Sequence, residues 1–160
     1  MKNIVLCRID DRLIHGQVVT AWVKQTNGNK IIVVDDPLTK DAFMQKILKA
    51  AAPPNVKVDV LSIVDAASVL KEEPLEGEKV IILVKIPEVL EKLIERGVIL
   101  EKIILGGMGA KTGRSKFNKN VSASLDEVAS MKRIIKNGTA IYFQLVPTEK
   151  ATDIQKLLES

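Results

Sequence analysis

The sequence predicts an α/β fold, in which a mostly parallel central sheet carries helices on both faces. The first observation is that β-branched apolar runs, such as residues 31–34, alternate with segments of helical periodicity along the 160-residue chain. The second is that these runs are continuous rather than alternating, which is typical of strands covered on both faces. Repeated strand–helix–strand units also imply right-handed crossovers and a mostly parallel sheet.

The first half of the chain contains three predicted strands and three predicted helices. In order they are strand 4–9, helix 16–25, strand 31–34, helix 40–51, strand 56–61 and helix 63–71. The Asn-Gly pair at 27–28 is a left-handed stop signal for the first helix. Thr39 is expected to cap the second helix, which the prolines at 53–54 end. Ser62 is expected to cap the third helix.

The second half continues the alternation. It contains strand 79–84, a helix from Pro87 to about residue 96, strand 103–105, a glycine-rich loop at 106–113, a helix closed at 137–138, strand 140–146 and an amphipathic helix at 148–158. Pro87 suits the first turn of its helix. The segment from Ser124 to Glu127 is a capping box that opens the next helix. No repeat, low-complexity tract or long linker appears, so one domain is expected over residues 1–160.

Composition excludes several function classes. Charged residues interrupt every apolar run, so no segment is long enough to span a bilayer, and the apolar stretch near the N-terminus is too short for a signal peptide. A single cysteine cannot form an internal disulfide, which suits a reducing, cytosolic compartment. The net charge is only +4 and aromatic residues make up 3%, so platforms for base stacking are missing. An acidic protein partner or a phosphate suits this chain better than a nucleic acid.

Chemistry-bearing residues gather where predicted strands end, the place at which open α/β sheets bind ligands. The candidates are Asp10, Arg12, His15, Asp35, Asp36 and the loop at 106–113. His15 is the only histidine in the chain, and it stands after two arginines and directly before a helix start. A histidine that only fills or caps a loop is the alternative interpretation.

The segment around His15 has the chemistry needed to carry a phosphoryl group. A neutral imidazole keeps one nucleophilic nitrogen at physiological pH and can form a phosphoramidate. Arg8 and Arg12 can offer planar forks to the equatorial oxygens, and the N–H groups of the helix start add an anion site. Either Asp10 or the next aspartate could orient an arginine or fix the tautomer of the imidazole.

Two further segments have open interpretations. Asp35 and Asp36 could hold a metal or orient a basic residue, but a solvated turn before a proline is favoured. The glycine-rich loop could cradle phosphate with Lys111 and Arg114, or it could be a turn without a ligand. No Gly-Lys-Ser/Thr triplet occurs in the chain, so the loop is not a Walker A motif.

The remaining special side chains favour structural roles. Cys7 lies within the first predicted strand and is expected to be a small buried hydrophobe rather than a nucleophile. Trp22 falls on the apolar face of the first helix and is expected in the core. One histidine and one cysteine are too few soft ligands for a zinc site.

The loop sequence RIDDRLIHGQV at 8–18, followed by Trp22 and the IIVVDD segment at 31–36, resembles enzyme IIB of the mannose/fructose/sorbose class of the sugar phosphotransferase system. The similarity continues through residues 52–56, 105–108, 120–122 and 146–148, and so covers essentially the whole chain.

The resemblance implies a sheet of about seven strands in a cytosolic subunit that associates with a membrane transporter. It implies that His15 Nδ1 accepts phosphate from a phosphohistidine of enzyme IIA and passes it to a sugar entering through enzymes IIC and IID. It places Arg8, Arg12 and Asp10 beside His15, and it requires neither a metal nor an organic cofactor. The transported sugar and a possible homo-oligomer stay open.

Enzyme IIA must reach His15, so an exposed apolar surface is expected around the loop. Leu13 and Ile14 are candidates for this contact, and anchoring of the loop to the core is their alternative role.

The sequence also allows two rival functions. A response-regulator receiver domain also begins with a strand that ends in paired acids, here Asp10 and Asp11. A receiver also needs an acceptor aspartate at the end of its third strand, but Asp59 lies in the middle of strand 56–61. It needs a lysine at the end of its fifth strand, where strand 103–105 leads into two glycines instead. The second rival is a non-catalytic module that binds a nucleotide or another phosphorylated ligand at the loop 106–113.

Overall fold

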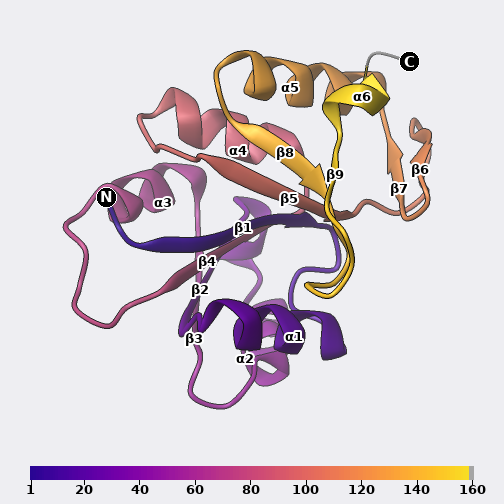
Figure 1. The fold of residues 1–160 in the computed structure, drawn as a ribbon. Coiled ribbons are helices and arrows are strands. Elements are labelled where there is room, and N and C mark those ends of the chain that lie inside the picture. Colours follow the sequence, from indigo (N-terminus) through magenta and orange to yellow (C-terminus); the bar gives the residue numbers. More distant parts are fainter. Residues whose placement is uncertain (159–160) are drawn as a thin grey trace.

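The computed structural model describes residues 1–158, so the last two residues of the expected domain lie outside the described part (Figure 1). Its centre is a seven-stranded sheet with the order β3-β2-β4-β1-β5-β8-β9. The strands are β1 (Ile4–Asp10), β2 (Lys30–Val34), β3 (Lys57–Leu61), β4 (Val80–Val84), β5 (Lys102–Gly107), β8 (Ala140–Phe143) and β9 (Thr152–Asp153). All neighbours pair in parallel except β8 and β9, which are antiparallel. The expected α/β class, with a mostly parallel sheet of about seven strands, is confirmed.

Helices cover both faces of the sheet (Figure 1). One face carries α1 (Gly16–Thr26), the 3₁₀ turn η1 (Pro37–Lys40) and α2 (Ala42–Ala51); the other carries α3 (Ile63–Leu70), α4 (Pro87–Glu95), α5 (Leu125–Lys136) and the short α6 (Gln155–Leu158). Each face has its own apolar core, with Trp22 and Leu48 in the first and Leu90 and Met131 in the second. Among the described helices, none is both long and apolar enough to cross a membrane.

Local capping signals were read correctly in several places. The Ser62 hydroxyl accepts a hydrogen bond from the N–H of Asp65 at 3.1 Å and opens α3. Ser124 and Glu127 form the expected reciprocal capping box at the start of α5. Asn27 has φ 57° and ends α1 in the left-handed region. These signals depend only on neighbours in sequence, so they can be predicted without knowledge of the fold.

Two helix predictions were wrong. Thr39 lies inside η1, and the side chain of Asp41 caps α2 by accepting from the N–H of Met44 at 3.0 Å. Residues 148–158 do not form one helix, because Ile154 donates its N–H to the carbonyl of Ile141 at 3.1 Å beside the β8–β9 pairing. Only the single turn of α6 follows β9. Pairing with a distant strand thus overrides the amphipathic pattern.

The glycine-rich segment also differs from the prediction of a plain loop. Gly106 and Gly107 complete β5. Farther along the chain, β6 (Ser115–Asn118) and β7 (Val121–Ala123) form an antiparallel hairpin that the sequence analysis missed. The strand predicted at 140–146 ends at Phe143, and the chain then turns across the end of β1 toward Arg8.

Candidate functional site

The segment that joins β1 to α1 is a tight loop at the carboxyl edge of the central strand. Leu13 has φ 57° and donates its N–H to the carbonyl of Asp10 at 2.9 Å, and Gly16 has φ 44°. The side chains of Leu13 and Ile14 are buried in the core beneath α1. Both residues therefore anchor the loop, and they do not form the exposed docking surface that the sequence analysis had considered.

The carboxylate of Asp10 is the centre of the site. The residue is 1% exposed. Its Oδ1 accepts from the N–H and the Nε of Arg12, each at 3.1 Å, and its Oδ2 accepts from the Nη2 of the same arginine at 3.1 Å. Burial pulls the pKa of Asp10 upward, but the hydrogen bonds from Arg12 and His15 outweigh it and leave this pKa below its ordinary value. The carboxylate therefore stays ionised at neutral pH.

His15 is the N-cap residue of α1, and its imidazole is held by this carboxylate. Its Nε2 lies 3.1 Å from Oδ2 of Asp10. An ionised carboxylate only accepts hydrogen bonds, so Nε2 carries the proton and the lone pair remains on Nδ1. None of the described residues hydrogen-bonds Nδ1. The side chain is 23% exposed, so an approaching group can reach it.

The N-terminus of α1 adds positive potential beside the ring. The side chain of His15 makes no capping hydrogen bond, and the first turn of the helix contains no acidic residue. The first N–H groups of a helix lack intrahelical partners and favour an anion. A negatively charged group bound at Nδ1 therefore has a helix start close by.

Arg12 faces outward, whereas Arg8 faces inward. The Arg12 side chain is 50% exposed while its fork rests on Asp10, and the hydrogen bond to Asp10 raises its pKa. The Arg8 side chain is 2% exposed and donates from Nη1 to the carbonyl of Gln144 at 2.8 Å. Its Nη2 donates to the carbonyl of Leu145 at 2.9 Å and to Asp10 at 3.4 Å. Both arginines were expected to offer their forks to phosphate oxygens, but only Arg12 lies at the surface.

The pocket of Arg8 depends on residues that the sequence analysis did not connect with the site. Its guanidinium lies over the ring of Trp22, 5.3 Å from the centroid, and the Trp22 Nε1 donates to the carbonyl of Leu145 at 3.0 Å. A Cβ on Gly106 would lie 2.1 Å from Nη2 of Arg8. Gly106 therefore makes room for the guanidinium, and Trp22 is in the core as expected.

Arg114, a candidate phosphate ligand in the sequence analysis, has a buried side chain that pairs with two carboxylates, those of Asp11 and Glu127. Its Nη1 donates to Oδ2 of Asp11 at 3.2 Å and to the carbonyl of Gly109 at 2.9 Å. Its Nε and Nη2 form a fork on Glu127 at 2.9 and 2.8 Å. Lys111 is exposed. The capping signal had identified Glu127 as a helix-start residue but gave no sign of this second role.

Asp35 and Asp36 stand apart from His15. They follow β2, which is separated from β1 by β4 in the sheet. Oδ1 of Asp35 accepts from the N–H of Leu38 at 2.9 Å, and Oδ1 of Asp36 accepts from the N–H of Ile63 at 2.8 Å. Asp35 is buried, and its Oδ2 lies 3.8 Å from Nζ of Lys85, so it faces a basic side chain as well as the turn into η1. Asp36 joins this turn to the start of α3. The fully solvated turn that the sequence favoured therefore does not describe Asp35. Among residues 1–158, no group of three or more His, Cys, Asp or Glu side chains is placed to hold a metal ion.

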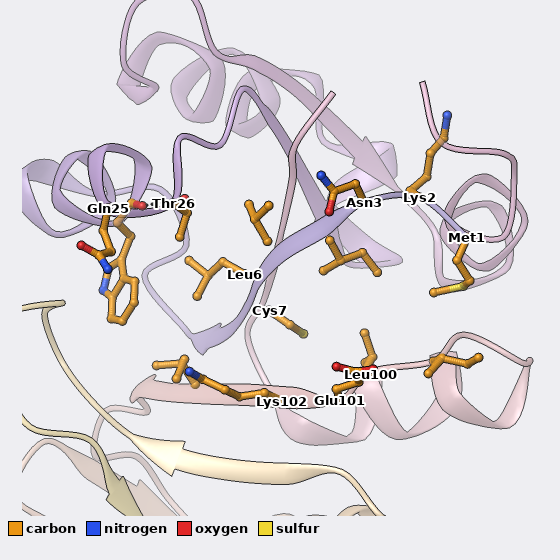
Figure 2. Close-up of a pocket in the computed structure, with 15 residues that line it drawn as sticks. Met1, Lys2, Asn3, Leu6, Cys7, Gln25, Thr26, Leu100, Glu101 and Lys102 are labelled. Carbon is orange, nitrogen blue, oxygen red and sulfur yellow. Dashed lines mark hydrogen bonds between the residues drawn. The ribbon is translucent and has the colours of Figure 1, made fainter. Parts of the chain in front are cut away.

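A cavity of about 610 Å³ opens between β1 and β5 at the opposite edge of the sheet (Figure 2). The two strands pair only from Arg8 and Ile104 onward, so they separate before that point. Leu6, Thr26 and Lys102 are among the residues that line it. Neither His15 nor the loop at 106–113 belongs to its walls, so the cavity does not support the rival ligand-binding site at that loop.

Solved structures define the class of protein to which this fold belongs. The chain is similar to the crystal structure of the IIBSor domain of the sorbose permease from Klebsiella pneumoniae, with a TM-score of 0.93 and 31% identity over 98% of this chain and 96% of that one. The fold is therefore that of a IIB component of the phosphotransferase system.

The sequence comparisons place the chain more closely. The family model described as the sorbose subfamily IIB component of the phosphotransferase system matches residues 4–160, and the chain belongs to this family. It is 38% identical to the sorbose-specific EIIB component of Lacticaseibacillus casei, over 94% of this chain and 92% of that protein. It is 34% identical to the mannose-specific EIIAB component of Escherichia coli strain K12, over 97% of this chain and 48% of that protein. The family supports a phosphotransferase role.

Proposed function

We propose that this chain carries a phosphoryl group on Nδ1 of His15, taken from a phosphohistidine of enzyme IIA and passed to a sugar that enters through membrane enzymes IIC and IID. One observation carries the proposal. The ionised carboxylate of Asp10 holds Nε2 of the imidazole at 3.1 Å, which leaves the lone pair on Nδ1 of a side chain that is 23% exposed.

The transfer step balances without any further reactant. The lone pair of Nδ1 attacks the phosphorus of the incoming phosphohistidine, and a new N–P bond forms as the donor's N–P bond breaks. The donor imidazole leaves with the electron pair of that bond. The ring of His15 becomes positively charged, and the buried carboxylate of Asp10 stabilises this charge through the proton on Nε2. Because donor and acceptor are similar imidazoles, transfer in both directions is expected.

The two arginines contribute at different distances from the phosphorus. Arg12 is half exposed and cationic, so it can meet the equatorial oxygens together with the N–H groups of α1. Arg8 is buried behind Asp10, where it helps to hold the carboxylate. It is therefore proposed as a positioning residue. The exchange between imidazoles requires no metal and no organic cofactor.

The partners follow from the family and from the proposed chemistry. The name of the mannose-specific EIIAB relative joins A and B components in one protein, which supports enzyme IIA as the phosphate donor. Delivery to a sugar places the chain, at least transiently, beside the membrane enzymes IIC and IID on their cytoplasmic side.

Phosphorylation with defined components tests the proposal. The purified protein is incubated with phosphoenolpyruvate, the general carrier enzymes and a cognate enzyme IIA, and the modified residue is mapped by mass spectrometry. We expect one acid-labile, alkali-stable phosphate on His15. His15→Ala should take up none, whereas Lys111→Ala, which removes an exposed lysine of the neighbouring loop, should react like the parent. An alkali-labile phosphate on an aspartate would instead support the receiver-like rival.

A further inference from the structure

We infer that Asp11, Arg114 and Glu127 form a positioning network that fixes the reactive loop in the geometry needed for phosphoryl transfer. The inference rests on the proposed function. It concerns three residues that do not touch the imidazole, and it assigns to Arg114 a role different from that of a phosphate ligand.

The network joins two distant parts of the chain. The Arg114 guanidinium is buried and forms a two-pronged contact with Glu127, at 2.9 and 2.8 Å. Glu127 is fixed in turn by the capping box, since its Oε1 accepts from the N–H of Ser124 at 2.9 Å. The arginine is therefore held to the start of α5 before it reaches the loop at the end of β1.

The remaining nitrogen of the guanidinium, Nη1, contacts the loop that joins β1 to α1. Nη1 of Arg114 donates to Oδ2 of Asp11 at 3.2 Å, and the same oxygen accepts from the N–H of Gly109 at 2.7 Å. The N–H of Asp11 donates to the carbonyl of Gly107 at 3.0 Å. Asp11 is thus tied to the end of β5 through its backbone and to the chain just beyond it through its side chain.

The position of Asp11 explains why these hydrogen bonds matter for phosphoryl transfer. It lies between Asp10, which holds the imidazole, and Arg12, which supplies the exposed cation. A shift of its backbone would move both neighbours relative to Nδ1. Misalignment of about 1 Å at a transfer site can cost roughly two orders of magnitude in rate.

Charge balance argues against Arg114 as a phosphate ligand. Its hydrogen bond to Glu127 raises its pKa, so it remains cationic, but Glu127, Asp11 and the carbonyl of Gly109 already accept from its Nε, Nη1 and Nη2. Lysine cannot replace it, because a single ammonium group lacks the fork that binds Glu127 while a third nitrogen reaches Asp11.

Three variants test the network: Asp11→Asn, Arg114→Lys and Glu127→Gln. We expect each to lower the maximal rate of transfer from enzyme IIA about 10-fold, with the KM for the phosphorylated donor unchanged. The double variant Asp11→Asn/Arg114→Lys should be little slower than either single variant, because both break the same contact.

Ser124→Ala is the matched control for a purely structural role. It removes the other half of the capping box, whose hydroxyl accepts from the N–H of Glu127 at 3.1 Å, without touching Arg114. We expect this variant to unfold at a lower denaturant concentration and to transfer phosphate at the parent rate. If the rates of the three network variants fall no more than that of Ser124→Ala, the network inference is wrong.

The nuclear magnetic resonance signals of the imidazole separate failure of the inference from failure of the proposed function. Because His15 is the only histidine, its ring protons give the only imidazole signals of the chain. They should shift in the network variants and stay in place in Ser124→Ala, even if the parent takes up no phosphate. Unmoved signals in all variants would overturn the inference, whereas shifted signals in a chain that accepts no phosphate would count against the proposed function alone.

Discussion

At the scale of single residues, the main feature of the site is a pair of buried charges, Arg8 and Asp10. Arg8 and Asp10 are both nearly inaccessible to solvent, and unpaired buried charges are costly. One carboxylate meets the inner guanidinium, the outer guanidinium of Arg12 and the imidazole of His15. Asp10 therefore serves stability on one side and chemistry on the other.

Replacing Asp10 with asparagine should affect both properties. The amide is neutral and can donate to Nε2, so the proton of the imidazole no longer has a defined place and Arg8 remains buried without its counter-charge. We expect Asp10→Asn to lose about 3–5 kcal/mol of unfolding free energy and the phosphorylation rate to fall by roughly 100-fold or more. Urea unfolding and the rate of phosphate uptake from enzyme IIA measure the two effects.

Arg12→Lys provides the comparison, because it keeps a charge at the exposed position and leaves the buried pair of Arg8 and Asp10 intact. It should slow transfer with little loss of stability. If Asp10→Asn were as stable and as fast as the parent, the central role of this carboxylate would be refuted.

The composition of the loop allowed Asp10, Arg12 and His15 to be placed together from sequence, because they follow one strand within a few residues. The inward direction of Arg8 could not be predicted. It is set by the carbonyls of Gln144 and Leu145, more than 130 residues farther along the chain.

At the scale of elements, the geometry of β5 decides whether Arg8 fits. The strand ends with Gly106 and Gly107, and the absence of a side chain on Gly106 leaves the space that the guanidinium occupies. The segment after β8 then covers the guanidinium and supplies its acceptors. Two elements that adjoin β1 only in the folded sheet therefore build one pocket.

Gly106→Ala tests this pocket. The new methyl group would lie 2.1 Å from Nη2 and 2.2 Å from Cζ of Arg8, so the guanidinium must move and lose its contacts with the carbonyls. We expect a loss of about 1–3 kcal/mol in unfolding free energy, together with slower phosphorylation.

Gly109→Ala is the matched control for this substitution. A Cβ there would lie 3.6 Å from Oδ2 of Asp11, an ordinary van der Waals distance, and the N–H that donates to Asp11 is retained. Stability and transfer rate should therefore stay close to those of the parent. Equal losses in the two variants would show that the space beside Arg8 is not what matters.

The β elements that the sequence did not reveal share one physical cause. Caps such as Ser62 and the box at 124–127 were predictable because both partners lie within one turn of helix. The β6–β7 hairpin and the two-residue strand β9 were missed because each is held by cross-strand pairing rather than by a strong local pattern.

At the scale of the whole molecule, the alternation of parallel strands and helices was predictable because the spacing of apolar residues along the sequence differs between the two. The resulting sheet has a separate apolar core on each face. The ionised groups of the site are concentrated at the carboxyl edge, where β1 and β5 end. The order of the strands follows from long-range packing, which no local pattern contains.

Acid should destabilise the fold in a defined range. The pKa of Asp10 and that of Glu127 are both lowered: burial alone would raise them, but hydrogen bonds from Arg12 and from Arg114, respectively, outweigh it. Such groups add stability above the pKa of the unfolded chain, and this stability is lost as the pH falls through the lower folded values. We expect the urea midpoint to stay nearly constant from pH 7 to about pH 5 and to fall below about pH 4.

The same titration of Asp10→Asn provides the check. Because this variant lacks one of the carboxyls whose pKa is lowered, its midpoint should change less steeply in acid than that of the parent. Identical slopes would mean that Asp10 binds protons equally in the folded and unfolded chain, contrary to its hydrogen bonding.

The single thiol of the chain has a practical consequence. Cys7 lies in the middle of β1, is 3% exposed although it adjoins the cavity, and has its pKa raised by burial. Nucleophilic attack requires an accessible thiolate, which the folded chain withholds. Thiol-specific alkylating reagents can therefore modify Cys7 only through openings that uncover the central strand. The mass that one such reagent adds would time those openings without an engineered cysteine.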